Sequence, residues 1–95
     1  MFVLHVELNV KPGSQNALQD TFVGTFVPAI SQQAGFQGVK LLRPAENGGG
    51  DYRLSIAFDD KASQQKWVAT DLHGQVWPQM ESHCLGFSVK NYLAV

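Results

Sequence analysis

The residues with the clearest chemical potential lie in one stretch, KWVATDLHGQVWPQM at 66–80, where two tryptophans bracket a histidine. An imidazole such as that of His73 has an ordinary pKa of about 6.5, so it can exchange a proton near neutral pH. Trp67 and Trp77 offer flat apolar surfaces, and His73 and Trp77 would share a face of a helix. The stretch therefore fits an aromatic slot that contains a base. It also fits a helix whose tryptophans simply fill a core.

Composition and charge exclude several classes of protein. The chain has 95 residues, which suits a single domain over 1–95. Its formal charge of −1 comes from 7 basic and 8 acidic residues without runs, and a nucleic-acid or membrane partner would favour a basic patch. Cys84 is the only cysteine, so no intramolecular disulfide can form, which favours a reducing compartment. The start, MFVLHVELNV, is too polar and short for a signal peptide, and we expect a cytoplasmic protein.

Two periodicities divide the chain into elements. Alternation of apolar and polar residues predicts strands over 2–10, 36–44, 51–58 and 85–93. Helical spacing predicts helices over 15–34, about 60–69 and about 70–82. The resulting order, β-α-β-β-α-β, is the ferredoxin-like α+β arrangement, a four-stranded antiparallel sheet with helices on one face.

Several residues predict where the helices start, bend and stop. Ser14 is a candidate N-cap for the first helix, and Asp59 or Asp60 for the second. Pro28 interrupts the first helix and predicts a kink or a loosened turn, because proline lacks a backbone N–H. Gly35 stands where a C-terminal cap belongs.

The sheet face away from the helices needs a cover, and a second copy of the chain is the obvious source, giving a face-to-face homodimer. The apolar set of strand 2–10 and the set containing His5 and Asn9 face opposite ways. If the apolar set meets the helices, His5 and Asn9 point to the dimer interface. If the reverse holds, they enter a pocket. Strict alternation favours the first arrangement, and Arg53 follows the same parity.

The chain resembles the antibiotic biosynthesis monooxygenase family of the dimeric α/β-barrel superfamily, and the similarity covers nearly its whole length. The strings that carry it are VELNVKPGSQNAL at 6–18, PAISQQAGFQGVKLLRP at 28–44 and DDKASQQKWVATDLHGQVWPQM at 59–80. The last resembles a family pattern in which a helix tryptophan, here Trp67, precedes "S/T-x-x-H", here Thr70-Asp71-Leu72-His73. The resemblance implies a homodimer with a pocket in each subunit between sheet and helices. Some members are cofactor-independent oxygenases of polycyclic phenols and quinols, and others degrade haem.

The resemblance therefore implies a cofactor-independent monooxygenase that acts on an aromatic or quinol small molecule. The alternative is a dimeric ligand-binding or regulatory domain of the same fold without catalysis. The resemblance implies that no cofactor is needed. We expect no metal site, because the three histidines lack metal-ligand spacing. His73 is the candidate base. The candidate substrate-binding residues are Trp67, Trp77, Phe22, Phe26, Asn9, His5 and Arg53.

The residues disfavour haem as the substrate. In the haem-degrading branch, the iron ligand is a histidine several positions beyond the helix tryptophan. With Trp67 as that tryptophan, the ligand position falls near Trp77, which cannot bind iron, and His73 lies one turn too early. The branch's strand-one asparagine falls near Val6. A third hypothesis has no pocket at all, and a cavity between 15–34, 60–82 and the sheet would separate it from the others. We expect His83 to be exposed and the Cys84 thiol to be buried or inert.

Overall fold

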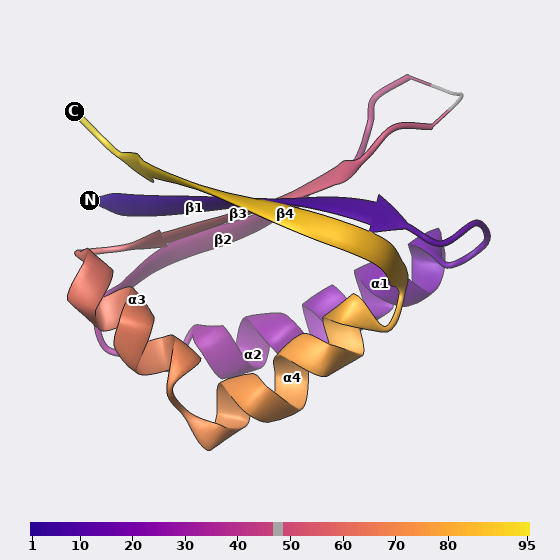
Figure 1. Cartoon of the computed structure of the whole chain (residues 1–95). Coiled ribbons are helices and arrows are strands. Elements are labelled where there is room, and N and C mark those ends of the chain that lie inside the picture. The colour runs from indigo at the N-terminus through magenta and orange to yellow at the C-terminus, as the bar shows by residue number, and fades with distance from the viewer. Residues whose placement is uncertain (47–48) are drawn as a thin grey trace.

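The computed structural model describes residues 1–46 and 49–95. Figure 1 shows a sheet with helices packed beneath it and with both chain termini at one end. The elements in chain order are β1 (Phe2–Val10), α1 (Gln15–Thr21), a π-helical turn η1 (Phe22–Phe26), α2 (Val27–Ile30), β2 (Phe36–Leu42), β3 (Tyr52–Phe58), α3 (Lys61–Val68), α4 (Asp71–Glu81) and β4 (Cys84–Leu93).

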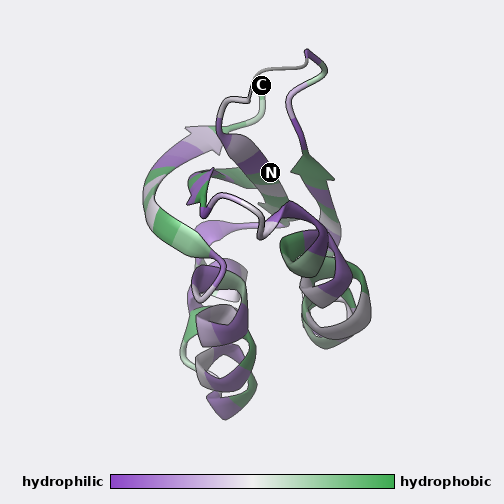
Figure 2. Cartoon of the chain, turned by 90° about the vertical axis from the view of Figure 1, so that its right-hand side faces the viewer, coloured by the Kyte–Doolittle hydropathy of each residue, from purple (hydrophilic) through white to green (hydrophobic). Residues whose placement is uncertain are grey.

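The four strands form one antiparallel sheet in the order β2-β3-β1-β4. The helices cover a single face of it, as Figures 1 and 2 show from two sides. This is the predicted ferredoxin-like α+β fold. The hairpin strands are shorter than predicted, because β2 ends at Leu42 and β3 begins at Tyr52.

The alternation in β1 decides which side chains meet the helices. Phe2, Val6 and Leu8 are buried on the helix side, while His5 and Asn9 belong to the opposite set. The neighbouring strand β3 repeats the pattern, with four buried residues against Arg53 and its neighbours. The strands are accordingly banded in hydrophobic and hydrophilic colours in Figure 2. The apolar set of β1 therefore faces the helices, and the set that contains His5 and Asn9 faces away from them, as strict alternation predicts.

The loosened turn predicted at Pro28 lies just before that residue. The N–H of Val27 donates to the carbonyl of Phe22, five residues back, and Pro28 falls in the first turn of α2. A proline is tolerated there because a first-turn N–H has no partner within the helix. The helix ends at Ile30 rather than at 34, and the Ser31 hydroxyl donates to the Val27 carbonyl.

Of the predicted N-caps, one acts as a side-chain cap. Ser14 occupies the predicted N-cap position of α1, but its side chain makes no capping hydrogen bond. Asp60 caps α3, accepting from the backbone N–H of Ser63 at 2.8 Å, and this contact lowers the pKa of its carboxyl group. Asp59 instead accepts a hydrogen bond from the Gln37 side chain.

Gly35 ties the start of β2 to the start of α3. It has a φ of +81°, and a Cβ added there would lie 2.8 Å from the Cβ of Ser63. Its carbonyl accepts the N–H of Asp59 at 2.8 Å. Only glycine combines this conformation with such a close approach. Among the described residues, no helix has both the length and the apolar character that crossing a membrane requires.

Candidate functional site

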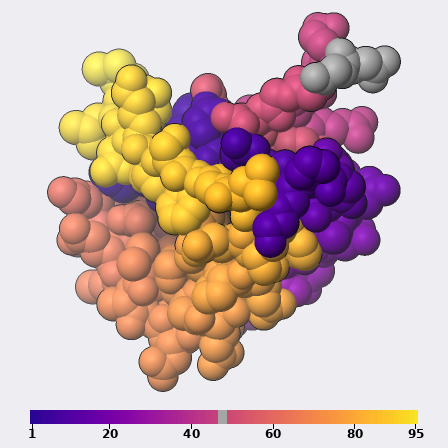
Figure 3. Space-filling model, turned by 45° about the vertical axis from the view of Figure 1, so that its right-hand side comes forward, coloured from indigo at the N-terminus to yellow at the C-terminus, as the bar shows by residue number. Residues whose placement is uncertain are grey.

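A cavity of about 330 Å³ lies between the sheet and the last two helices. Figure 3 shows β4 directly above α3 and α4 on this face of the molecule. The residues that line this cavity come from three strands of the sheet, from η1, and from α3 and α4. The lining residues are Phe2, Leu4 and Val6 of β1, Phe26, Ile56 of β3, Lys61, Gln64, Gln65, Trp67 and Val68 of α3, His73 and Trp77 of α4, and Phe87, Val89 and Asn91 of β4.

The cavity exists because β4 is an edge strand that the helices do not fully cover. Phe87 is 44% exposed and Val89 is 52% exposed, although both belong to the helix-facing set of β4. In a sheet packed throughout, residues of this parity would be buried. Two large apolar side chains on the wall of an open cavity are typical of a small-molecule site.

The two tryptophans have different environments in the cavity wall. Trp67 is 2% exposed and packs edge-on against Phe26, with ring centroids 6.2 Å apart. Trp77 is half-buried and meets Phe87 edge-on at 5.2 Å. Trp67 therefore belongs to the core and to the cavity wall together, whereas Trp77 lies nearer the surface.

His73 is the one imidazole in the lining. It is half-buried, and its ring meets Trp67 edge-on with centroids 5.1 Å apart. Burial lowers the pKa of His73 below the ordinary 6.5, since the apolar surroundings penalise the charged form. The imidazole is consequently neutral at pH 7, which is the form that accepts a proton.

The hydroxyl of Thr70 connects the backbone of Trp67 to the backbone of His73. Its Oγ1 donates to the carbonyl of Trp67 at 2.7 Å and accepts the backbone N–H of His73 at 3.1 Å. The Thr70-Asp71-Leu72-His73 string is thus a helix N-cap, with α3 ending before it and α4 beginning after it. The cap places His73 in the first turn of α4, against Trp67.

The other predicted aromatic residues differ in position. Phe26 lines the cavity. Phe22 does not. It stacks on Phe26 at 6.3 Å and borders a separate hollow beside Leu41 and Tyr52.

His5, Asn9 and Arg53 belong to the opposite face of the sheet, as strand parity requires. They do not line the cavity with His73, so the structure does not bring these three together with the other predicted site residues. The His5 ring lies 4.9 Å from that of Tyr92. The Arg53 guanidinium pairs with Glu7, with Nε 2.7 Å from Oε1.

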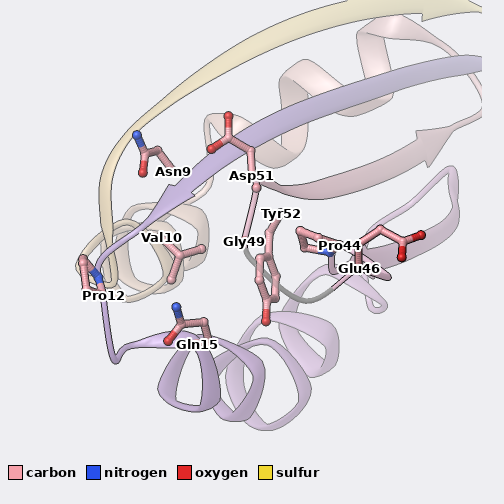
Figure 4. A pocket seen from close by; sticks show the side chains of 10 residues that line it. Asn9, Val10, Pro12, Gln15, Pro44, Glu46, Gly49, Asp51 and Tyr52 are labelled. Atoms are coloured by element: carbon pink, nitrogen blue, oxygen red, sulfur yellow. The ribbon is translucent and has the colours of Figure 1, made fainter.

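A second hollow, of about 440 Å³, lies at the other end of β1 and contains Asn9. Figure 4 shows Tyr52 pointing from the start of β3 toward the helix that carries Gln15. The phenol oxygen of Tyr52 accepts a hydrogen bond from Gln19 at 2.9 Å. Although larger, this hollow is mostly polar and holds no imidazole and no tryptophan. The cavity beside His73 is therefore the better candidate site.

Several lining residues were not predicted from the sequence. Lys61, Gln64 and Val68 follow helical spacing along α3, and Asn91 has the parity of Phe87. The spacing was visible in the sequence. It could not reveal whether that face of α3 met solvent or a cavity, because this depends on where β4 lies.

The remaining histidine and the cysteine lie outside the cavity. His83 was expected to be exposed, but it is half-buried and its Nε2 lies 2.9 Å from the Thr21 hydroxyl oxygen. That partner is distant in sequence, so local pattern could not show it. Cys84 is buried, and burial raises the pKa of its thiol, as expected for an inert cysteine. Across residues 1–46 and 49–95, no group of three potential ligands could hold a metal ion.

Together, the one-sided sheet and the helices that cover it define a ferredoxin-like α+β domain with an aromatic-lined cavity. The model of the antibiotic biosynthesis monooxygenase family matches residues 1–77. Since this match covers well over half of the sequence, the chain belongs to that family. No curated protein matches the chain.

Solved structures share the fold at low sequence identity. MhuD from Mycobacterium tuberculosis, a haem degrader solved with two haems bound, is 21% identical with a TM-score of 0.81, covering 100% of this chain and 96% of that one. A variant of SnoaB, a cofactor-independent oxygenase from Streptomyces nogalater, is 15% identical with a TM-score of 0.85, covering 98% and 91%. An antibiotic biosynthesis monooxygenase is 17% identical with a TM-score of 0.81, covering 100% and 99%. At these identities the likeness establishes the fold.

Replacing Thr70 tests the bridge between Trp67 and His73. Thr70→Val removes the hydroxyl at nearly constant volume and should lower the free energy of unfolding by about 1 kcal/mol, the usual value of an N-cap. Thr70→Ser keeps the hydroxyl and should retain most of that stability. Urea denaturation followed by tryptophan fluorescence measures both. Equal losses in the two variants would show that the hydroxyl does not stabilise this turn.

Proposed function

We propose that this protein is a cofactor-independent monooxygenase whose substrate is an aromatic or quinol small molecule. The observation that carries the proposal is the neutral imidazole of His73 in a cavity walled by Trp67 and Trp77. Membership of the monooxygenase family supports it. So does the fold shared with the cofactor-independent oxygenase SnoaB.

Cofactor-independent oxygenation requires few groups from the protein, because the substrate itself supplies the electrons that reduce O₂. Removing a proton from a phenol or hydroquinone gives an anion that is electron-rich enough to pass an electron to O₂. The two radicals then combine to form a carbon–oxygen bond. Cleavage of the O–O bond leaves one oxygen atom in the substrate. The other departs as water with two hydrogens from the substrate, so no external reductant is consumed.

The lining residues have matching roles in this scheme. His73 takes the phenolic proton, because its lowered pKa keeps it unprotonated at neutral pH. Trp67 and Trp77 present flat walls to the ring system, and Val6 and Ile56 keep the sheet side apolar. Desolvation by such walls strengthens any hydrogen bond to the substrate anion.

Haem is the less favoured substrate. A haem iron needs an axial protein ligand, and His73 is the cavity's one histidine. Its ring lies edge-on against Trp67. The family resemblance puts the iron ligand near Trp77 and the branch's asparagine near Val6. Both residues are apolar parts of the cavity wall. We therefore assign a smaller aromatic substrate.

One observation favours the non-catalytic alternative, a dimeric ligand-binding or regulatory domain. Catalytic imidazoles are commonly oriented by a hydrogen bond at the second ring nitrogen. Within the described residues, neither ring nitrogen of His73 has a hydrogen-bond partner. Under this alternative the cavity binds an aromatic ligand that is recovered unchanged.

We also propose a homodimer formed through the open face of the sheet. This face mixes polar residues with Val3, Ala57 and the exposed ring of Tyr92. On the same face, Nδ1 of His5 is shielded from solvent without a hydrogen-bond partner in the part of the chain that the structure describes. A second copy would cover the apolar residues and could supply a partner for that nitrogen.

The dimer is tested by a charge placed at the centre of the open face. Ser55 pairs with His5 on one side and with Lys40 on the other, so Ser55→Lys would put a new cation beside Lys40 and two residues from Arg53, and the dimer should dissociate. Sedimentation equilibrium measures the mass. Gln79→Lys, on the exposed side of α4, is the control and should remain a dimer. A monomeric parent protein would contradict the proposal.

Oxygen uptake tests catalysis. With a dihydroxyanthracene or naphthol substrate, His73→Gln should reduce the rate by about 100-fold or more, the usual contribution of a general base. The parent rate should fall on acidification with a midpoint below the ordinary imidazole pKa of about 6.5, because burial disfavours the protonated form. His83→Gln, which alters a histidine outside the cavity, should leave the rate unchanged. Uptake that is no faster than in buffer would refute turnover of these compounds.

A further inference from the structure

One wall of the cavity carries a polar stripe. Lys61, Gln64, Gln65 and Val68 stand on a single face of α3, at the spacing that aligns residues one and two turns apart. Asn91 lines the cavity from the facing strand β4. Three amides and one ammonium group are therefore available to a ligand whose remaining contacts are apolar.

Lys61 is the one lysine, arginine or carboxylate residue in the lining, and it forms no ion pair with another described residue. The adjacent carboxylate of Asp60 is engaged in capping the N–H of Ser63 at 2.8 Å. That of Asp59 accepts a hydrogen bond from Gln37. The ion pair found among the described residues joins Arg53 to Glu7 on the other face of the sheet. Lys61 thus contributes an unpaired positive charge to the cavity.

The charge lies at one end of the cavity. Lys61 begins α3, three residues after β3 ends at Phe58, the partner of Phe2. Asn91 lies at the same end, two residues from Leu93, the other partner of Phe2. Figure 1 shows α3 at the end of the sheet where both termini lie.

The opposite end is aromatic. There Trp77 meets Phe87, whose partner in β1 is Leu8. Asn91 lies four positions after Phe87 in β4, which is about 13 Å at the usual rise of an antiparallel strand. The cavity therefore has a cationic end and an aromatic end, separated by roughly the length of a few fused rings.

We propose that the cavity takes a planar aromatic carboxylate, with the ring system between the tryptophans and the carboxylate on Lys61. A single lysine matches a single negative charge, and amides such as Gln64 or Asn91 can donate to the second carboxylate oxygen. This assignment of the substrate class rests on the proposed function for its site. It concerns binding alone and requires no turnover.

The test compares the binding of 2-naphthoate and its neutral isostere 2-naphthamide by isothermal titration calorimetry. Neither compound has a hydroxyl group to oxidise, so failed turnover and failed charge recognition give separate results. Because Lys61 is exposed, the parent should prefer naphthoate by a modest factor, about fivefold at low salt. Raising the salt concentration should shrink that preference.

Substitutions then assign the preference to Lys61. Lys61→Gln should bind both probes equally, and Lys61→Arg should restore the preference. Lys66→Gln removes a charge from the same helix outside the cavity and should behave as the parent. Circular dichroism confirms that each variant is folded. No preference in the parent, no binding of either probe, or an equal loss in Lys66→Gln would overturn the proposal.

Discussion

The sidedness of β1 is the constraint on which the rest of this domain depends. Because successive side chains of a strand point to opposite faces, one alternating segment determines where the helices pack. β1 is hydrogen-bonded to both β3 and β4, so its parity extends to each neighbour through the pairing register. Val6 faces the cavity for this reason, and His5 faces away from it. A shift of one residue in the register would exchange the two sets.

Much of the fold could be predicted from local pattern. The alternation in 2–10 and 51–58 gave the sheet its two faces, and Pro28 marked the place where the first helix loosens into a π-helical turn. The site was accessible in part, because Trp67, His73 and Trp77 are close in sequence and a short turn brings the first two into contact.

What local pattern could not supply depends on contacts between distant segments. From the sequence alone, Lys61 and Gln64 fit an ordinary solvent-exposed helix face. Only the position of α3 relative to β4 shows that they line the cavity. The partner of His83 is Thr21, 62 residues earlier in the chain. For His5 and Arg53, strict alternation already favoured the face away from the helices, and the strand pairing and the cavity lining agree with it.

The site combines burial with access. Trp67 is part of the core, so its ring is a fixed wall, and the Thr70 hydroxyl bonds to its carbonyl and to the N–H of His73. His73 is buried enough to stay neutral at pH 7, yet exposed enough to exchange its proton with water. On the other side, Phe87 and Val89 remain partly open because β4 is an edge strand. A ligand that entered there would complete the packing that this edge lacks.

The central claim is that a flat aromatic ligand occupies the space between Trp67 and Trp77, and the two indole N–H signals of the chain report on it directly. The decisive measurement is a ¹H–¹⁵N correlation spectrum recorded under argon during titration with 2-naphthol. We predict that both indole signals and the backbone signal of His73 shift together and saturate at one ligand per chain, while the signals of His5 and Arg53 stay in place. Shifts confined to the open face of the sheet, or indole signals that do not respond at saturating ligand, would contradict it.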